Sequence, residues 1–473
     1  MNSKKLKKYG LFILIYGLLA VVFCFIGDKQ IKRVSTEEKW GENTGYFSEL
    51  IEGMKLEQYF SSNMDVITGL KFTPIAYSRK NEGNIILTIK DVENNSVLVQ
   101  ETIDVSQFQD NVLYEWNFTN PVEHIKGRPL CLIVESFCET GKGITLFYDM
   151  QNRNTNNVLN INGEIFDGCL SVVLSGEDYS LFGTYYWYWV TLAGVVLLAY
   201  LFWSDYQERK GKLTKGNLIF VIWKKYKFLM QQLVARDFKT KYKRSVLGYL
   251  WSFLNPLLTM LVQYVVFSTI FKADIEKYPV YLLTGIILFN FFSEAVGQGL
   301  GSIVYNAQLI TKVYVPKYIY PVTKVASTSI NLFISIIPLL LVVLLTGVKV
   351  TKSIVLLPFV LVCLLLFCIG MVLLLSSAMV FFRDTQYLWG IISMIWMYAT
   401  PLFYPEDIIP SHFRFIQTFN PMYHMIKFAR ILFIEGVSPS PMTYFACLVS
   451  AIVSCVVGAV VFKKTQNKFV LYI

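Results

Sequence analysis

Eight apolar stretches constrain this chain more than any other feature of its sequence. Most of them are about as long as the ~20 residues of α-helix that cross the hydrocarbon core of a bilayer. Hydrophobic residues make up 54% of the chain. The sequence therefore predicts a multi-pass α-helical membrane protein with about eight spans. The stretches cover residues 11–26, 183–203, 250–271, 280–301, 323–345, 354–381, 387–404 and 444–462.

The formal net charge of +10 is distributed unevenly along the chain. Residues 27–182 contain 13 Lys and Arg against 23 Asp and Glu, a net charge of −10, while the rest contains 30 against 10. Loops that stay in the cytoplasm are enriched in Lys and Arg. We therefore expect residues 27–182 outside the cell and both termini inside, in a chain of the plasma membrane that contacts membrane lipids. The basic excess requires no nucleic acid as a partner.

The chain begins with four lysines before its first apolar stretch, as a secretory signal peptide does. No small-residue cleavage site follows, because Gly27-Asp28-Lys29 comes directly after the stretch. We interpret residues 1–26 as an uncleaved N-terminal transmembrane helix and residues 183–203 as a second one. The second opens on five consecutive aromatic residues, 185–189, which are typical of an interfacial belt. Stacking of these rings against sugars is the alternative.

Residues 27–182 have the pattern of a folded β domain. Short alternating segments recur between turn signals such as Asn94-Asn95 and Asn162-Gly163, without long helical periodicity. We expect a β-sandwich, jelly-roll-like, inserted between the two helices. Its odd number of cysteines, Cys131, Cys138 and Cys169, is compatible with one disulfide or with free thiols. The expected strands cover residues 84–90, 113–118, 130–136, 144–148 and 170–174.

Nothing in the sequence indicates catalysis by this chain. A nucleotide-binding Walker A loop is absent, so the chain is not expected to hydrolyse ATP. His124, His412 and His424 have no Cys, Asp or Glu at ligand spacing, so no metal site is expected. His412 and His424 invite comparison with membrane acyltransferases, yet interfacial histidines are the commoner case. No Asp-x-Asp pair supports a glycosyltransferase.

A basic and aromatic segment precedes the last six apolar stretches. Residues 209–244 contain 12 Lys and Arg against one acid, Asp237, and they alternate with Tyr, Phe, Leu and Met. Such a helix can lie at the membrane surface with its apolar side chains down and its charges in water. We expect residues 204–248 to form a cytoplasmic linker and amphipathic interface helix, followed by a six-span core, 249–473. Within 401–441, the prolines and helical spacing indicate short helices that dip into the outer leaflet.

One stripe of the span at 280–301 is polar, because Asn290, Glu294 and Gln298 recur every four residues. An ionisable side chain at membrane depth normally faces protein or water. The stripe could line a translocation path or form a seam between helices or subunits, and the sequence leaves both open. Aromatic side chains in the same region could offer faces to pyranose rings or fill the core. The candidate path residues are Tyr249, Trp251, Phe253, Phe292, Glu294, Trp389, Trp396 and Tyr398.

From about residue 220 to the C-terminus, the chain resembles the ABC-2 type permeases of polysaccharide and teichoic-acid exporters. The similarity lies in four ordered motifs over some 250 residues. They are LVARDFKTKYK at 233–243, which continues into LGYLW at 247–251 and LNPLL at 254–258, NAQLITKVYVPK at 306–317, FRD at 382–384, and Asn420-Pro421 with Arg430.

The resemblance implies a homodimer of permeases that pairs with a dimer of a separate ATP-binding ABC subunit. That subunit would bind ATP and Mg²⁺, and this chain would bind no cofactor. The substrate would be a lipid-linked polysaccharide. The interface helix would contact the ATPase through Arg236, Asp237, Lys239, Tyr242 and Lys243. A coupling helix would do so through Asn306, Leu309, Lys312, Val313, Pro316 and Lys317.

The front half departs from the usual pattern of this family, which begins near the interface helix. Because residues 27–182 are strongly acidic, they would repel a polyphosphate over about one Debye length, about 8 Å at physiological salt. We therefore expect a neutral glycan, for example a rhamnose-rich one, in preference to teichoic acid. A membrane sensor or scaffold with an extracellular ligand-binding domain, or a membrane glycosyl- or acyltransferase, is the alternative function.

Overall fold

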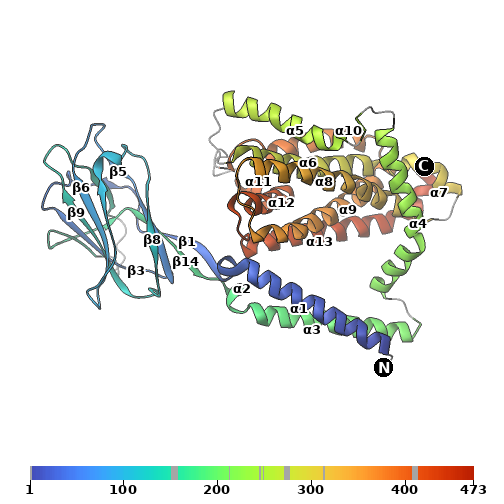
Figure 1. Ribbon diagram of the computed structural model, residues 1–473, viewed down its shortest axis with the longest axis horizontal. Coiled ribbons are helices and arrows are strands. Elements are labelled where there is room, and N and C mark those ends of the chain that lie inside the picture. The colour runs from blue at the N-terminus through green and yellow to red at the C-terminus, as the bar shows by residue number, and fades with distance from the viewer. Residues whose placement is uncertain are drawn as a thin grey trace. The chain divides into compact units, whose positions relative to one another are not determined.

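The computed structural model describes residues 3–150, 158–211, 214–243, 247–248, 250–270, 277–312, 315–406 and 414–472 (Figure 1). They belong to two compact units. One is Lys32–Tyr186, which is built mainly from strands, and the other combines Met1–Ile31 with Trp187–Ile473 and is helical.

The strand unit contains two large antiparallel sheets. One has the strand order β1 (Arg33–Lys39), β14 (Val172–Tyr179), β4 (Val66–Phe72), β8 (Tyr114–Glu123). The other has the order β12 (Glu164–Phe166), β11 (Leu159–Ile161), β3 (Lys55–Ser61), β9 (Pro129–Phe137), β6 (Asn84–Asp91), β7 (Val97–Asp104). A small sheet joins β13 (Cys169–Leu170), β10 (Thr145–Asp149) and β2 (Gly45–Tyr46), and β5 (Pro74–Ile75) also pairs with β10.

One hydrophobic core lies between the two large sheets. Alternate residues of β3, such as Leu56 and Phe60, point into it, and Leu70 and Leu174 enter it from the other sheet. This period of two is what a half-buried strand requires. All five expected strand segments are present, although 170–174 is divided between β13 and β14. The Asn162-Gly163 turn joins β11 to β12, with both residues in the left-handed region that such a two-residue turn needs.

The three cysteines of the strand unit are buried and free, so the structure contains no disulfide among them. Burial raises the pKa of the Cys131 thiol to about 12 and that of Cys169 to about 11. Neither thiol is therefore ionised near neutral pH.

The helical unit is formed by long apolar helices and short surface helices. Seven segments of the described residues are long and apolar enough to span a membrane. The helices are α1 (Ser3–Lys32), α3 (Tyr186–Arg209), α4 (Lys215–Tyr242), α5 (Leu250–Val265), α6 (Tyr278–Leu300), α7 (Ala307–Lys312), α8 (Ile319–Leu345), α9 (Leu357–Phe381), α10 (Thr385–Ala399), α11 (Arg414–Phe419), α12 (Pro421–Arg430), α13 (Pro441–Thr465) and α14 (Phe469–Tyr472). A short helix α2 (Leu181–Thr184) ends the strand unit.

The span expected at 387–404 differs from the structure. Helix α10 is only 15 residues long, so it is shorter than the ~20 residues that cross the hydrocarbon core. It ends before Pro401, whose ring disfavours a helical conformation at Thr400 and which has no N–H to donate. The expected short helices that follow it are present as α11 and α12.

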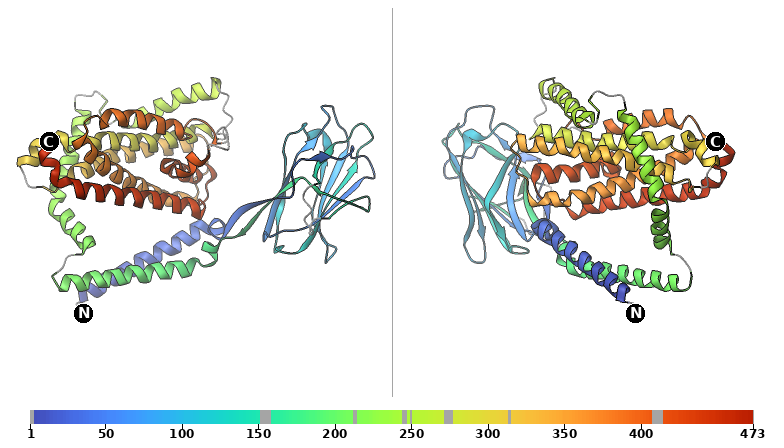
Figure 2. Two further views of the ribbon diagram at one scale, coloured as in Figure 1. Left: turned by 180° about the vertical axis from the view of Figure 1, so that it is seen from behind. Right: turned by 45° about the vertical axis from the view of Figure 1, so that its right-hand side comes forward.

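Helices α1 and α3 lie side by side in both views of the helical unit (Figure 2). The hydroxyl of Tyr9 donates to the carboxylate of Asp205, and the hydroxyl of Tyr16 donates to the carbonyl of Val190 at 2.7 Å. These contacts join the first helix of the chain to the third.

Helix α6 lies at the centre of the core, where most of its residues are buried against α5, α8, α9 and α12. Helices α9 and α13 form another close pair. A Cβ on Gly370 would lie 2.2 Å from the backbone carbon of Ser454, and one on Gly458 would lie 2.1 Å from the carbonyl oxygen of Gly370. Glycine at both positions permits this close approach of the two backbones.

Candidate functional site

A small hydrophobic core joins the interface helix to the predicted coupling segment. From α4, Leu233 is buried in it, and Leu229 packs against it. Ile303 and Ile310 enter it from the segment around α7. The views in Figure 2 show α4, α7 and the C-terminus at the same end of the helical unit. The two segments expected to contact an ATPase therefore share their packing.

The C-terminal segment belongs to this core as well. The sequence suggests a simple tail after the last span, but α14 folds back, and Phe469 is completely buried in the core. Lys317 Nζ donates to the carbonyl of Gln466 at 2.6 Å and lies 5.8 Å from the centroid of the Phe469 ring. Burial lowers the pKa of Lys317. Its ammonium is directed into the protein and not toward a partner surface.

The remaining coupling residues are placed differently from one another. Leu309 and Lys312 are exposed on α7, whereas Asn306 is buried and donates through Nδ2 to the carbonyl of Ser302 at 2.8 Å. Pro316 is half-buried. Val313 lies outside the described residues. Leu309 and Lys312 thus remain accessible to a partner in this structure.

Helix α4 presents a basic stripe on its exposed face. Arg236, Lys239 and Lys243 are exposed, and their spacing of three and four residues places them on one side of a helix. The side chain of Tyr242 lies outside the described part of the structure.

The acid within this helix points the other way. Asp237 Oδ2 is 2.7 Å from Nζ of Lys324 in α8, and its Oδ1 is 3.1 Å from Arg236. We expected Asp237 to contact the ATPase, but the structure pairs it within the chain. The sequence held a signal for this pair, because Lys324 is an ionisable residue near the start of a predicted span.

A second ion pair lies one helical turn further along α4. Lys241 Nζ is 2.5 Å from Oε1 of Glu294 in α6. The same oxygen accepts from Gln298 Nε2 at 2.7 Å and from Asn331 Nδ2 at 3.4 Å. Glu294 therefore collects donors from three helices.

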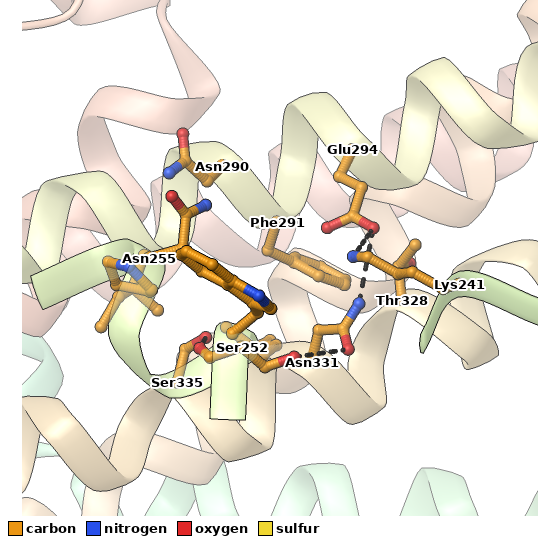
Figure 3. A pocket seen from close by; sticks show the side chains of 13 residues that line it. Lys241, Ser252, Asn255, Asn290, Phe291, Glu294, Thr328, Asn331 and Ser335 are labelled. Carbon is orange, nitrogen blue, oxygen red and sulfur yellow. Dashed lines mark hydrogen bonds and ion pairs between the residues drawn. The ribbon is translucent and has the colours of Figure 1, made fainter. Parts of the chain in front are cut away.

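This ion pair forms one end of a cavity of about 310 Å³ between α4, α5, α6 and α8 (Figure 3). Figure 3 shows Lys241, Glu294 and Asn331 together at that end and Asn255 beside Asn290 at the other. The complete lining is Lys241, Trp251, Ser252, Asn255, Pro256, Ile287, Asn290, Phe291, Glu294, Thr328, Asn331, Leu332 and Ser335.

The cavity offers amides, hydroxyls and one aromatic face, and its single acid is paired with its single base. Such a surface can donate to and accept from the hydroxyl groups of a sugar without a net charge. Two of the expected path residues, Trp251 and Glu294, lie in it. Ser252 and Asn331, which the sequence analysis did not single out, hydrogen-bond to each other at 3.3 Å.

Three other expected path residues form part of the helix core. Phe292 is fully buried, Trp389 is nearly so, and both rings pack with Trp396 or with each other at centroid distances of 5.0–5.8 Å. Their rings pack against protein and do not line the cavity. Phe253 is half-buried, Tyr398 is exposed, and Tyr249 lies outside the described residues.

The short helices between α10 and α13 are fixed by two polar side chains. Asn420 caps α12 by accepting from the N–H groups of Met422 and Tyr423, and it also accepts from Trp396 Nε1 at 2.8 Å. Trp396 further lines an open groove of about 510 Å³ with residues of α10 and α11.

Arg430 holds the other end of α12. Its buried guanidinium donates to the carbonyls of Pro401 at 2.8 Å, Leu402 at 3.1 Å and Tyr281 at 3.3 Å. It also lies 3.3 Å from the centroid of the Tyr281 ring. Arg430, which belongs to the motifs of the resemblance, thus joins α12, the segment after α10 and α6.

Comparison with known proteins agrees with this architecture. The model of the ABC-2 type transporter family matches residues 229–434, which include α5 to α12, the exposed basic stripe and the cavity. Residues 1–228, with the strand unit, lie outside that match.

Three relatives illustrate the similarity. The O-antigen export system permease protein RfbA of Klebsiella pneumoniae is 32% identical over 246 residues, which are 51% of this chain and 93% of the relative. RfbA of Myxococcus xanthus is 31% identical over 247 residues, 52% of this chain and 95% of the relative. The polysialic acid transport protein KpsM of Escherichia coli is 26% identical over 220 residues, 45% of this chain and 82% of the relative. The resemblance inferred from the motifs is confirmed, and the chain belongs to the ABC-2 type transporter family.

Proposed function

We propose that this chain is the permease subunit of an ABC exporter that moves a lipid-linked polysaccharide outward across the plasma membrane. The printed functions of its relatives, O-antigen export and polysialic acid transport, support a polysaccharide substrate. The chain carries no Walker A loop, so a separate ABC subunit supplies the energy, with ATP and Mg²⁺ bound there.

The observation that carries this proposal is the connection between the exposed basic stripe and the cavity. Arg236 and Lys239 face away from the core, while Asp237 and Lys241 on the same helix form ion pairs with α8 and α6. A displacement of α4 by a partner therefore acts directly on two helices that line the cavity. The apolar core shared with α7 makes both contact segments move together.

The mechanism follows from the position of Lys241. Its ammonium belongs to α4 but forms part of the cavity wall. When ATP binding draws the partner subunits together, a shift of α4 separates Lys241 from Glu294 and changes the cavity at that end. The nearby amides of Gln298 and Asn331 then keep the carboxylate hydrogen-bonded, so the separation need not leave a bare charge.

The assembly we propose is a homodimer of permeases with two ATPase subunits. Both termini lie in the cytoplasm, and residues 27–182 lie outside. The eight long strands of that domain alternate between the two large sheets, except for the β6–β7 hairpin, and the first strand pairs with the last. This connectivity supports a jelly-roll-like domain.

For the substrate we favour a neutral glycan, such as a rhamnose-rich one, over teichoic acid. The exposed Lys241–Glu294 pair leaves the cavity without net charge, and residues 27–182 carry a net charge of −10 from 13 basic and 23 acidic residues. Both features disfavour a polyphosphate chain.

Reversing the basic stripe tests the coupling. The variant R236E/K239E/K243E is co-expressed with the ATPase subunit, and surface glycan and ATP hydrolysis are measured. We expect glycan to accumulate on the cytoplasmic side while the variant still inserts into the membrane. The matched control K463E/K464E/K468E makes the same change of charge at exposed positions near the C-terminus and should still export. Unaltered export by the α4 variant would overturn the proposal.

A further inference from the structure

The small sheet of the strand unit carries a group of aromatic side chains. Tyr46 on β2 and Phe147 on β10 are register partners, so their side chains stand on the same face of this sheet. Their ring centroids are 6.4 Å apart in an edge-to-face arrangement. The side chain of Tyr46 is 59% exposed. It is therefore not held there by burial in the core.

Tyr77 belongs to the same group. It follows β5, which pairs with β10 through Thr145, two residues before Phe147. Burial raises the pKa of the Tyr77 phenol, and the neighbouring Glu49 and Tyr46 add to the rise, while Arg79 and Thr145 oppose it. Tyr46 and Thr145 thus lie close to the Tyr77 hydroxyl. The ring of Tyr77 remains 37% exposed.

The backbone that presents Tyr77 is held in an unusual conformation. Tyr77 and Ser78 have φ values of 58° and 49°, a left-handed conformation that side chains other than glycine rarely adopt. Asp110 holds it, because its Oδ1 accepts from the N–H groups of Ala76 at 2.7 Å and Tyr77 at 3.2 Å, and its Oδ2 accepts from Ser78 Oγ at 2.9 Å. Strain maintained in this way at a surface is typical of functional positions.

A second set of contacts fixes the ring itself. The guanidinium of Arg79 lies 4.8 Å from the centroid of the Tyr77 ring and donates to the carboxylate of Glu49 and, at 3.1 Å, to the carbonyl of Gly143. Glu49 also accepts from the N–H of Gly143 at 2.7 Å. One side of Tyr77 is therefore covered by a neutralised, rigid support.

We propose that Tyr46, Tyr77 and Phe147 form a platform that binds the pyranose rings of a glycan chain. Pre-fixed aromatic faces bind the C–H faces of sugars at little cost in conformational entropy, and phenolic hydroxyls can hydrogen-bond to sugar hydroxyls. That the bound glycan is the exported one rests on the proposed function. The binding site itself does not depend on transport.

The charge of the domain selects the class of glycan. The only cation in contact with the platform, among the described residues, is Arg79, and it is paired with Glu49. No basic group is left there for a phosphate or a sialic acid carboxylate, and the surrounding domain is acidic overall. A neutral oligosaccharide is therefore the ligand that the chemistry fits.

The test uses the full-length protein in lipid nanodiscs and an array of neutral, sialylated and phosphate-bearing oligosaccharides. We expect binding to neutral probes, and a loss of about tenfold in affinity on Y77A or Y46A, because each removes one stacking face. Y179A removes a similarly exposed tyrosine from β14 and should bind as the wild type does. Y77W keeps a face for stacking and should retain most of the affinity.

Two results would overturn the platform. One is wild-type affinity in the double variant Y46A/Y77A, and the other is a wild-type protein that binds only the charged probes or none. The R236E/K239E/K243E variant separates the two proposals, because it should lose export and keep neutral-glycan binding. If it keeps export while Y46A/Y77A loses glycan binding, the platform stands and the coupling proposal fails.

Discussion

Lys241 and Glu294 are 53 residues apart in the sequence, and their side chains meet at 2.5 Å on the wall of the cavity. One belongs to the helix that faces a partner and the other to the most buried helix of the core. A single ion pair therefore connects the surface of the permease to its interior.

This connection predicts a charge-swap result. K241E and E294K should each reduce glycan export strongly, because each places like charges at the cavity wall. The double variant K241E/E294K restores an opposite pair and should recover part of the export. Both side chains are partly exposed, so the free energy of unfolding should change by no more than about 1 kcal/mol. Export no better in the double variant than in the single ones would contradict a role for the pair.

Arg430 predicts a large loss of stability. R430M removes the donor for three carbonyl groups in a buried site, which should cost about 3 kcal/mol or more. The measurement is the temperature at which detergent-solubilised protein leaves the monodisperse peak in size-exclusion chromatography. R430K, which keeps a charge but not the fork of donors, should fall between the wild type and R430M. Equal stability of R430M and the wild type would show that the contacts are not structural.

The close pair α9–α13 predicts opposite effects of alanine at two glycines. G370A places a Cβ 2.2 Å from the backbone of Ser454, so the two helices must separate and stability should fall by about 1–3 kcal/mol. G297A on α6 meets nothing within 4 Å. Its helix propensity should leave stability unchanged or raise it by up to about 1 kcal/mol. Thermal unfolding of both variants in the same detergent compares them directly, and a neutral G370A would refute the close packing.

Asp110 predicts a response of the Tyr77 loop to acid. Hydrogen bonds from Ser78 and from the backbone N–H of Ala76 lower the pKa of Asp110 below its ordinary value. For an acid whose pKa is lowered in the folded state, the stabilisation is complete above the unfolded value, about 3.9, and is lost as the pH falls through the folded one. The loop should therefore be intact at neutral pH and loosen only in strong acid.

Hydrogen exchange measured by mass spectrometry can follow that loop in the full-length protein. D110N should exchange faster than the wild type in peptides that cover residues 74–82 at pH 7, and the two should converge near pH 3. The exchange of β9, which has no contact with Asp110 in the described hydrogen bonds, should not change. Identical exchange of both proteins at pH 7 would remove the basis for a held loop.

The sequence allowed prediction of the class of fold because hydrophobic length and period act locally. Spans such as 280–301 and 444–462 and strands such as 84–90 are present close to the expected bounds. The span at 387–404 was wrong because an apolar average does not register where a helix stops. Pro401 lies inside that stretch and ends α10.

The site was predictable only where side-chain type alone decides. Glu294 was identified because a carboxylate in an apolar span needs a polar partner. Phe292 and Trp389 were placed on a path because an aromatic residue serves equally well in a core, and only the packing of helices far apart in sequence distinguishes the two. The partners of Asp237 and Lys317, which are Lys324 and Gln466, depend on that same packing.

The pairing of β1 with β14 has a consequence for how such a protein can be altered. Arg33 lies opposite Tyr179, so the strand unit is entered and left through two adjacent backbones about 5 Å apart. A domain attached at neighbouring points is a cassette, which can be removed, exchanged or acquired while the chain on both sides keeps its course. The glycan specificity of an exporter could in this way be rewritten by grafting a different outer domain, without any change to the helices that do the transport.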